Sequence, residues 1–160
     1  MKSADLDSVL IIGCGWVGIK LATSLISQNI NVFGTTRSAE KASSLHSLGI
    51  EPIIFDLEKE DAIQTDLPKV DAIVISISPG RGDQRSQYPK HIQKLSKLLA
   101  SSNQQVIMYS STSAYKGRMG IVTELDALPA PESDNIILAA EGELKTMIQD
   151  SVILRLGGLF

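Results

Sequence analysis

Short apolar runs alternate along the chain with stretches of helical periodicity. Apolar runs bounded by turn residues are typical of buried parallel strands, and the periodic stretches are typical of amphipathic helices. The runs predict strands over Val9–Ile12, Asn31–Thr35, Glu51–Phe55, Ala72–Ile77, Gln105–Ser110 and Val152–Leu156. The periodic stretches predict helices over Trp16–Gln28, Ala39–Leu48, Tyr88–Ala100 and Asn135–Gln149. This alternation predicts βαβ units and a parallel sheet.

The number of predicted strands defines the fold class. Six strands complete a doubly wound α/β sheet, and right-handed crossovers require the strand order 3-2-1-4-5-6. Ser38 is the expected N-cap of the second helix and Gly49 its end, while Ser133 or Asp134 is the expected cap of the last helix. The acidic link Glu58–Val70 is weakly patterned, and we predict one short helical turn there.

A glycine-rich turn follows the first predicted strand and opens the first predicted helix. It reads Gly13-Cys14-Gly15-Trp16-Val17-Gly18. In a dinucleotide-binding turn the first glycine allows the bend, the second lets the backbone approach a pyrophosphate, and the third lets helix and strand pack closely. The helix N-terminus then offers unpaired N–H groups and a positive dipole end to the phosphates. We therefore predict that Gly13, Gly15, Trp16, Val17 and Gly18 bind a dinucleotide; the alternative is a purely structural turn.

The end of the second predicted strand distinguishes NAD from NADP. NAD sites place Asp or Glu there for the ribose hydroxyls, whereas NADP sites use Arg near the extra phosphate. This chain reads Gly34-Thr35-Thr36-Arg37-Ser38, and no carboxylate follows until Glu40 inside the next helix. Arg37 is suited to pair with a phosphate, and the threonines, including Thr36, add hydroxyl donors together with Ser38. The pattern predicts NADP, with NAD as the second choice; the alternative is a surface arginine beside a helix cap.

A carboxylate and an apolar residue, Asp56-Leu57, follow the third predicted strand. Asp56 is suited to accept a hydrogen bond from an adenine amino group, while Leu57 packs on the ring. The alternative is a strand-end aspartate that forms a turn. Beside the glycine turn, we favour the adenine role.

Hydroxyl side chains crowd the end of the fifth predicted strand, in Tyr109-Ser110-Ser111-Thr112-Ser113-Ala114-Tyr115. Open α/β sheets bind ligands at the carboxyl ends of their strands. We therefore predict that these hydroxyls bond a substrate carbonyl or hydroxyl beside the nicotinamide. The alternative is a polar strand end whose hydroxyls bond the local backbone.

Composition limits the class of protein. The chain has 160 residues, which suits one dinucleotide-binding domain over residues 1–160, and its net charge of −3 gives no sign of a nucleic acid or an anionic membrane as partner. No apolar stretch is long enough to span a bilayer, and the polar start Met1–Asp7 is unlike a secretory signal, so we expect a cytoplasmic protein.

Cys14 is the single cysteine, so an internal disulfide is excluded. Its thiol either has a lowered pKa at the helix start or belongs to a small buried residue; we favour the buried residue. Neither His46 nor His91 has partners at metal-ligand spacing, so we predict no metal.

Taken together, these motifs resemble the short-chain dehydrogenase/reductase superfamily, in its extended or atypical branch, the relatives of sugar-nucleotide epimerases and dehydratases. The closest likeness is to bacterial proteins of the NAD-dependent epimerase/dehydratase type, whose members begin with a similar GCG-x-VG turn. The resemblance implies a Rossmann fold and an NAD(P) cofactor. The residues that carry it are Gly13-Cys14-Gly15-Trp16-Val17-Gly18, Gly34-Thr35-Thr36-Arg37-Ser38, Asp56-Leu57, Val70-Asp71, Tyr109-Ser110-Ser111-Thr112-Ser113-Ala114-Tyr115 and Val152-Ile153-Leu154-Arg155-Leu156-Gly157-Gly158-Leu159-Phe160.

The resemblance also implies roles for the hydroxyl segment. Ser111 matches the family's Ser or Thr that polarises a substrate oxygen, and Tyr115 matches a second tyrosine that is usually structural. The family's catalytic Tyr-x-x-x-Lys falls further along the chain, where this sequence reads Pro131–Glu141 without a tyrosine and where the first lysine is Lys145. The usual acid/base pair is therefore missing. The family continues beyond the position of Phe160 into a substrate-binding portion, which we expect this sequence to lack. The apolar end favours a fragment of a longer protein or a tail buried against a partner; the alternative is a short disordered tail.

Three hypotheses follow. The first is an NAD(P)-dependent oxidoreductase or nucleotide-sugar epimerase/dehydratase that acts on a small molecule, either a sugar nucleotide or a carbonyl compound. In it Ser111 orients the substrate, and Tyr115 or a group beyond this chain supplies the proton. The second is a non-catalytic NAD(P)-binding module that senses the nucleotide or regulates a partner. The third, a Rossmann domain that binds another adenine-containing ligand, is disfavoured by the context of the hydroxyl segment. Family resemblance also predicts a homodimer.

Overall fold

The computed structural model describes residues 6–59, 66–101 and 103–158. Its strands are β1 (Ser8–Ile12), β2 (Asn31–Thr36), β3 (Glu51–Ile54), β4 (Ala72–Ile75), β5 (Gln105–Ser111) and β6 (Val152–Leu156). Its α-helices are α1 (Trp16–Ile26), α2 (Ala39–Ser47), α3 (Tyr88–Leu99) and α4 (Ile136–Met147). The 3₁₀ segments are η2 (Gly82–Gln87), η3 (Thr112–Tyr115) and η4 (Glu124–Asp126).

The strands form one six-stranded parallel sheet with the order β3-β2-β1-β4-β5-β6. In its first half, Val9 of β1 pairs with Val32 of β2 on one side and with Ala72 of β4 on the other. Phe33 of β2 pairs with Glu51 of β3. The predicted fold class and strand order are therefore confirmed.

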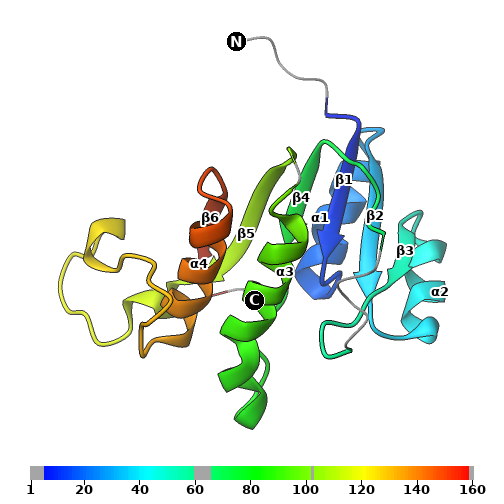
Figure 1. The fold of residues 1–160 in the computed structure, drawn as a ribbon. Helices are drawn as coiled ribbons and strands as arrows, with labels where there is room; N and C mark the ends of the chain where they lie inside the picture. The colour runs from blue at the N-terminus through cyan, green and yellow to red at the C-terminus, as the bar shows by residue number, and fades with distance from the viewer. Residues whose placement is uncertain (1–5, 60–65, 102, 159–160) are drawn as a thin grey trace. The chain divides into compact units, whose positions relative to one another are not determined.

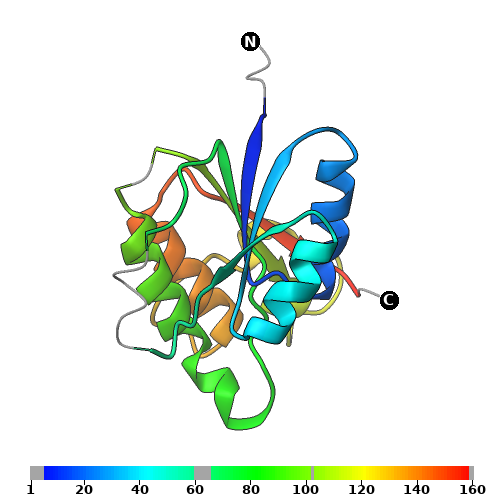
Figure 2. The same ribbon diagram turned by 90° about the vertical axis from the view of Figure 1, so that its right-hand side faces the viewer.

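The chain forms two compact units, which we describe separately. The first unit is Met1–Ile77 with Asn103–Ile107, and the second is Ser78–Ser102 with Met108–Phe160. In the first unit α1 and α2 lie on the same face of β1, β2 and β3 (Figures 1 and 2). Strand β1 is buried on both faces, with Leu10, Ile11 and Ile12 fully inaccessible to solvent, as its continuous apolar run predicts.

In the second unit α3 and α4 lie side by side (Figure 1). Ile92 and Leu95 of α3 and Leu144 of α4 are fully buried. A Cβ atom on Gly142 would lie 2.4 Å from the backbone of Ala130 and of Pro131. The segment that precedes α4 therefore crosses directly over the helix, and only glycine leaves room for it.

The predicted element ends are mostly right, with physical reasons for the differences. Ser38 caps α2, since its hydroxyl accepts the Lys41 N–H at 3.3 Å, and Gly49 ends that helix with φ +80°. Helix α1 ends two residues early because the chain turns at Asn29, which has φ +63°. Strand β4 stops at Ile75 and not at Ile77, although the Ser76 N–H still donates to the Ile12 carbonyl at 2.8 Å, and Ile77 lies against Gly13.

The predicted cap of the last helix is wrong. Neither Ser133 nor Asp134 caps α4; Asn135 does, and its side chain accepts the Ile137 N–H at 2.9 Å. An amide also carries donors, and Asn135 uses them on the carbonyl of Ser113 at 3.0 Å. It thus joins two segments through separate acceptor and donor atoms, whereas an ionised aspartate at this point would have no donor. The short helical turn predicted between residues 58 and 70 falls largely on residues 60–65, outside the described residues.

Candidate functional site

The first glycine of the turn after β1 is required by backbone geometry. Gly13 has φ +83°, and a Cβ atom there would lie 2.9 Å from Cγ1 of Ile77. The turn is fastened to β2, because the Gly13 N–H donates to the Thr35 hydroxyl at 2.8 Å and the Cys14 N–H donates to the Thr35 carbonyl at 2.9 Å. Thr35 is buried and its hydroxyl accepts a bond from the turn, while its role as a donor to the cofactor stays a prediction.

The other two glycines differ in what surrounds them. A Cβ atom on Gly18 would lie 3.1 Å from Cγ2 of Ile11 and 3.3 Å from the Gly13 carbonyl oxygen, so α1 and β1 pack tightly at this point. A Cβ atom on Gly15 would meet only the Gly13 carbonyl oxygen, at 3.9 Å. Gly15 therefore faces open space, as expected of the position at which backbone approaches a ligand.

Helix α1 presents an N-terminus that is suited to an anion. Gly15 is its N-cap and makes no side-chain bond, and the first turn contains no acidic residue. The first N–H groups of a helix have no acceptor within the helix, and the helix dipole is positive at this end. Trp16 is 59% exposed and Val17 is half-buried at the same end. These features fit a diphosphate at the start of α1, as the glycine pattern predicts.

Cys14 is a buried packing residue. It is 2% exposed and lies against Gly34, where an added Cβ atom would be 3.1 Å from the Cys14 sulfur. Burial raises the pKa of the Cys14 thiol to about 11. A lowered thiol pKa, one of the two possibilities considered above, is therefore wrong, because desolvation of the buried thiol raises its pKa more than the Lys41 charge lowers it.

The ends of β2 and β3 bring the predicted adenosine-binding residues to one edge of the first unit. The two strands are neighbours, and the Phe55 N–H still donates to the Thr36 carbonyl at 2.8 Å. Thr36 is buried, whereas the side chain of Arg37 is 69% exposed. Ser38 carries out its capping role and Arg37 is open to solvent at the position where a 2′-phosphate is expected.

Asp56 forms the turn that follows β3. Its carboxylate accepts the Glu58 N–H at 3.1 Å, and its carbonyl accepts the Lys59 N–H at 3.2 Å. The turn reading of Asp56 is therefore correct, and its role toward adenine, with Leu57, stays a prediction. The turn has a consequence that was not predicted: Glu58 lies 3.6 Å from the Arg37 guanidinium.

In the second unit the hydroxyl segment bonds largely to itself. Ser111 ends β5 and caps η3: its hydroxyl accepts the Ser113 N–H at 3.1 Å and donates to the Ser113 hydroxyl at 3.0 Å. Local bonding of the hydroxyls, the alternative considered above, is thus present at Ser111. Its role toward a substrate, and that of Tyr115, stay predictions.

A buried ion pair in the second unit was not predicted from the sequence. Arg155 of β6 lies 2.6 Å from Glu141 of α4, with side-chain exposures of 9% and 0%. Arg155 also donates to the Ala127 carbonyl at 2.6 Å, and its guanidinium carbon lies 4.9 Å from the centre of the Tyr115 ring. The Ser110 hydroxyl donates to Glu141 at 2.5 Å. Hydrogen bonding to Glu141 is the main reason why the pKa of Arg155 is raised.

Two signals in the sequence point to this pair in retrospect. Glu141 interrupts the apolar face of a helix, and Arg155 interrupts an apolar strand. A charged residue at a buried position needs a partner of opposite charge.

No replacement for the missing Tyr-x-x-x-Lys is found at the expected place. The Lys145 ammonium group donates to the carbonyls of Gln149 and Ser151 and so closes the end of α4. Burial raises the pKa of Tyr88, and the charge of Glu141 adds to the effect, while burial alone raises the pKa of Tyr109. Neither phenol is suited to release a proton near neutral pH.

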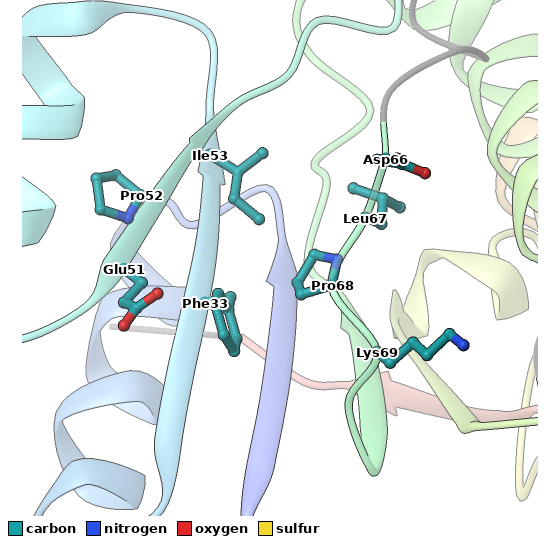
Figure 3. A pocket seen from close by; sticks show the side chains of 8 residues that line it. All are labelled: Phe33, Glu51, Pro52, Ile53, Asp66, Leu67, Pro68 and Lys69. Carbon is teal, nitrogen blue, oxygen red and sulfur yellow. The ribbon is translucent and has the colours of Figure 1, made fainter.

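One hollow of about 460 Å³ lies on the first unit (Figure 3). None of the residues predicted to bind the cofactor lines it. The lining residues of the hollow are Phe33, Glu51, Pro52, Ile53, Asp66, Leu67, Pro68 and Lys69.

Across the described part of the chain, His, Cys, Asp and Glu side chains form no group that could hold a metal ion. Nor is any helix there long and apolar enough to cross a membrane.

Comparison with known families decides the class of ligand. Residues 13–160 match the family model described as NAD(P)H-binding, so the match begins at the first glycine of the turn. The chain belongs to the NAD(P)H-binding family. Membership in this family confirms the predicted NAD(P) cofactor.

The chain is also similar to a curated protein and to solved structures. It is 30% identical to Protein YeeZ of Escherichia coli K12 over 162 residues, which cover 96% of this chain and 59% of YeeZ. The chain thus spans 59% of the length of this relative. A candidate NAD-dependent epimerase/dehydratase from Bacillus halodurans has a TM-score of 0.70 and 20% identity, over 96% of this chain and 72% of that one.

Two structures of reductases share the fold. Yeast methylglyoxal/isovaleraldehyde reductase Gre2, complexed with NADPH, has a TM-score of 0.65 and 18% identity over 94% of this chain and 56% of its own. Triphenylmethane reductase of Citrobacter sp., complexed with NADP(H), has a TM-score of 0.66 and 17% identity over 92% of this chain and 48% of its own. These structures share the fold that the predicted resemblance implies, and the family match supports its NAD(P)-binding part.

Proposed function

We propose that this NAD(P)H-binding chain prefers NADP and holds its diphosphate at the start of α1. The observation that carries the proposal is the contrast among the glycines: Gly13 and Gly18 are packed against protein, while Gly15 faces open space. Arg37 would bind the 2′-phosphate, because its guanidinium is exposed at the end of β2 and matches a phosphate in charge and geometry.

We further propose that the chain contributes to an oxidoreductase or epimerase/dehydratase reaction on a small carbonyl compound or sugar nucleotide. When bound, the reduced cofactor NADPH would supply a hydride to the substrate, or the oxidised cofactor NADP+ would accept one from it. Ser111 would orient a substrate oxygen by exchanging its bond to Ser113 for one to the ligand, and Tyr115 is the candidate proton donor of this chain. The cytoplasm and a homodimer are further predictions from the sequence.

A non-catalytic NADP-binding module is the second candidate. Two observations favour it: the Lys145 ammonium group is engaged at the end of α4, and the Ser110 hydroxyl is engaged by buried Glu141. Turnover separates the two candidates. We would follow the absorbance of NADPH against carbonyl compounds and sugar nucleotides, with Ser111→Ala as the test variant; tight binding without turnover favours the module.

The cofactor preference has a direct test. NADP should raise the melting temperature of the wild-type protein more than NAD does, and Arg37→Ala should weaken NADP binding roughly tenfold or more while it leaves NAD binding little changed. Thermal shift and calorimetric titration measure both effects. Lys20→Ala, which removes an exposed cation of α1, is the control and should change neither. An absent response to both nucleotides would contradict the proposal.

A further inference from the structure

We propose that Glu58 sets the balance between NADP and NAD by competing with the 2′-phosphate for Arg37. The inference rests on the proposed function, in which Arg37 binds that phosphate. It assigns to Glu58 a role in specificity that the sequence does not reveal, because 21 positions separate the two residues (58 − 37).

The backbone brings Glu58 to the end of β2. Parallel pairing places Thr36 of β2 opposite Ile54 of β3, so both strands end at the same edge. Asp56 then turns the chain, since its carboxylate accepts the Glu58 N–H at 3.1 Å. As a result the Glu58 carboxylate lies 3.6 Å from a terminal nitrogen of Arg37.

In dinucleotide-binding folds, the residue at this position determines the preference between NAD and NADP. A carboxylate at the end of β2 favours NAD, and an arginine there favours NADP. In the sequence, the segment at the end of β2 contains the arginine and no carboxylate. The folded structure places both charges at that edge, with Arg37 contributed by β2 and Glu58 by the turn after β3.

The contact between Arg37 and Glu58 is weak enough for a phosphate to replace it. The side chains are 69% and 55% exposed, and at 3.6 Å the contact is long for a charge-assisted hydrogen bond. Exposed ion pairs contribute little to stability. A phosphate offers Arg37 a stronger, two-pronged partner, but binding must first release the guanidinium from Glu58. NAD has no 2′-phosphate and leaves the pair intact.

Glu58→Gln tests the proposal by removing the negative charge while it keeps the shape of the side chain. NADP should bind this variant roughly two- to fivefold more tightly, which is the range expected for loss of an exposed ion pair. The dissociation constant for NAD should change less than the constant for NADP. Calorimetric titration of both nucleotides gives the ratio, and the melting temperature of the free protein should stay the same.

Two further variants make the result specific. Glu40→Gln removes an exposed carboxylate from the first turn of α2 and should leave the NADP-to-NAD ratio at its wild-type value. In an Arg37→Ala background, Glu58→Gln should no longer improve NADP binding, because the competition acts through Arg37.

Three results would overturn the proposal. If Glu58→Gln and Glu40→Gln give the same ratio, Glu58 has no special role, although NADP binding through Arg37 stands. If Glu58→Gln improves NADP binding equally with and without Arg37, the carboxylate acts by direct repulsion and not by competition. If the wild-type protein binds neither nucleotide, this inference and the proposed function fail together.

Discussion

The glycine turn of the first unit and the hydroxyl segment of the second unit both end strands, yet they treat their polar groups in opposite ways. At the glycine turn, Gly15 faces open space and the start of α1 carries no acidic residue. At the neighbouring end of β2, Arg37 is largely exposed and has a long contact with Glu58. In the hydroxyl segment, Ser111 bonds to Ser113, and Ser110 bonds to buried Glu141.

The difference shows which polar groups of the structure are available for a ligand. Polar groups that the protein leaves open to solvent are available for a ligand, whereas groups that satisfy one another are used to hold the fold. The first unit therefore carries strong evidence for cofactor binding. In the second unit Ser110 and Ser111 are bonded within the protein, and the proposed chemistry depends on whether a substrate can replace the bond between Ser111 and Ser113.

The largest effect should come from breaking the buried pair of the second unit. Arg155→Leu leaves Glu141 buried without its cation, so the free energy of unfolding should fall by about 3–5 kcal/mol. Denaturant titration measures the loss. If the pair existed to meet a ligand and not to hold the fold, the loss would be much smaller.

A double variant serves as the control for this prediction. Glu141→Leu combined with Arg155→Leu removes both charges, and it should be more stable than either single variant because no uncompensated charge remains. Equal destabilisation of the double variant would show that packing, and not charge, dominates at this site.

The next effect separates two glycines of one turn. Gly18→Val should lower the free energy of unfolding by roughly 1–3 kcal/mol, because the side chain would press on Ile11, to which even a Cβ atom is only 3.1 Å away. Gly15→Val should cost about 1 kcal/mol or less, since only a cap preference is lost. Denaturant titration of both variants gives the comparison.

NADP binding should be affected in the opposite order: among folded variants, Gly15→Val should weaken it more than Gly18→Val. Gly15→Val should abolish the rise in melting temperature caused by NADP, because its side chain would fill the space that the diphosphate needs. Retained binding in Gly15→Val would place the diphosphate elsewhere and would remove the contrast between the two regions.

The smallest effect concerns two exposed carboxylates, one in each unit. The pKa of Asp71 is lowered mainly by the Ser8 hydroxyl and then by the N–H groups of Asp7 and Ser8, and the pKa of Asp126 is lowered by Thr123. A lowered pKa in the folded state means that the stabilisation is present above the unfolded value, near pH 4, and is lost as the pH falls through the folded value. Asp71→Asn should therefore be less stable than wild type at pH 7, and the gap should close below about pH 4.

Asp126→Asn is the comparison for this prediction. Its carboxylate joins residues three positions apart, whereas Asp71 joins β4 to the start of β1. A local turn can open without global unfolding, so Asp126→Asn should lower the free energy of unfolding less than Asp71→Asn does. Denaturant titrations at pH 7 and pH 3.5 measure both variants, and a larger effect at Asp126 would contradict the argument.

Much of the first unit follows from local pattern. The apolar runs predict the strands, and the parallel order follows because right-handed crossovers leave one arrangement. Gly13, Gly15 and Gly18 could be assigned separate roles because each role depends on backbone geometry within one short turn. Ser38 was predictable as a cap for the same reason, since a cap bonds an N–H group a few residues away.

The tertiary structure alone decided which distant side chains meet. The residue that caps α4 is Asn135, because its amide also reaches the segment at Ser113. Glu141 meets Arg155 because a helix and a strand bring the two buried charges together. Glu58 meets Arg37 because two parallel strands end together and Asp56 turns the chain between them and Glu58. Periodicity and turn chemistry specify backbone over a few residues, but the partner of a charge is set by how whole elements pack.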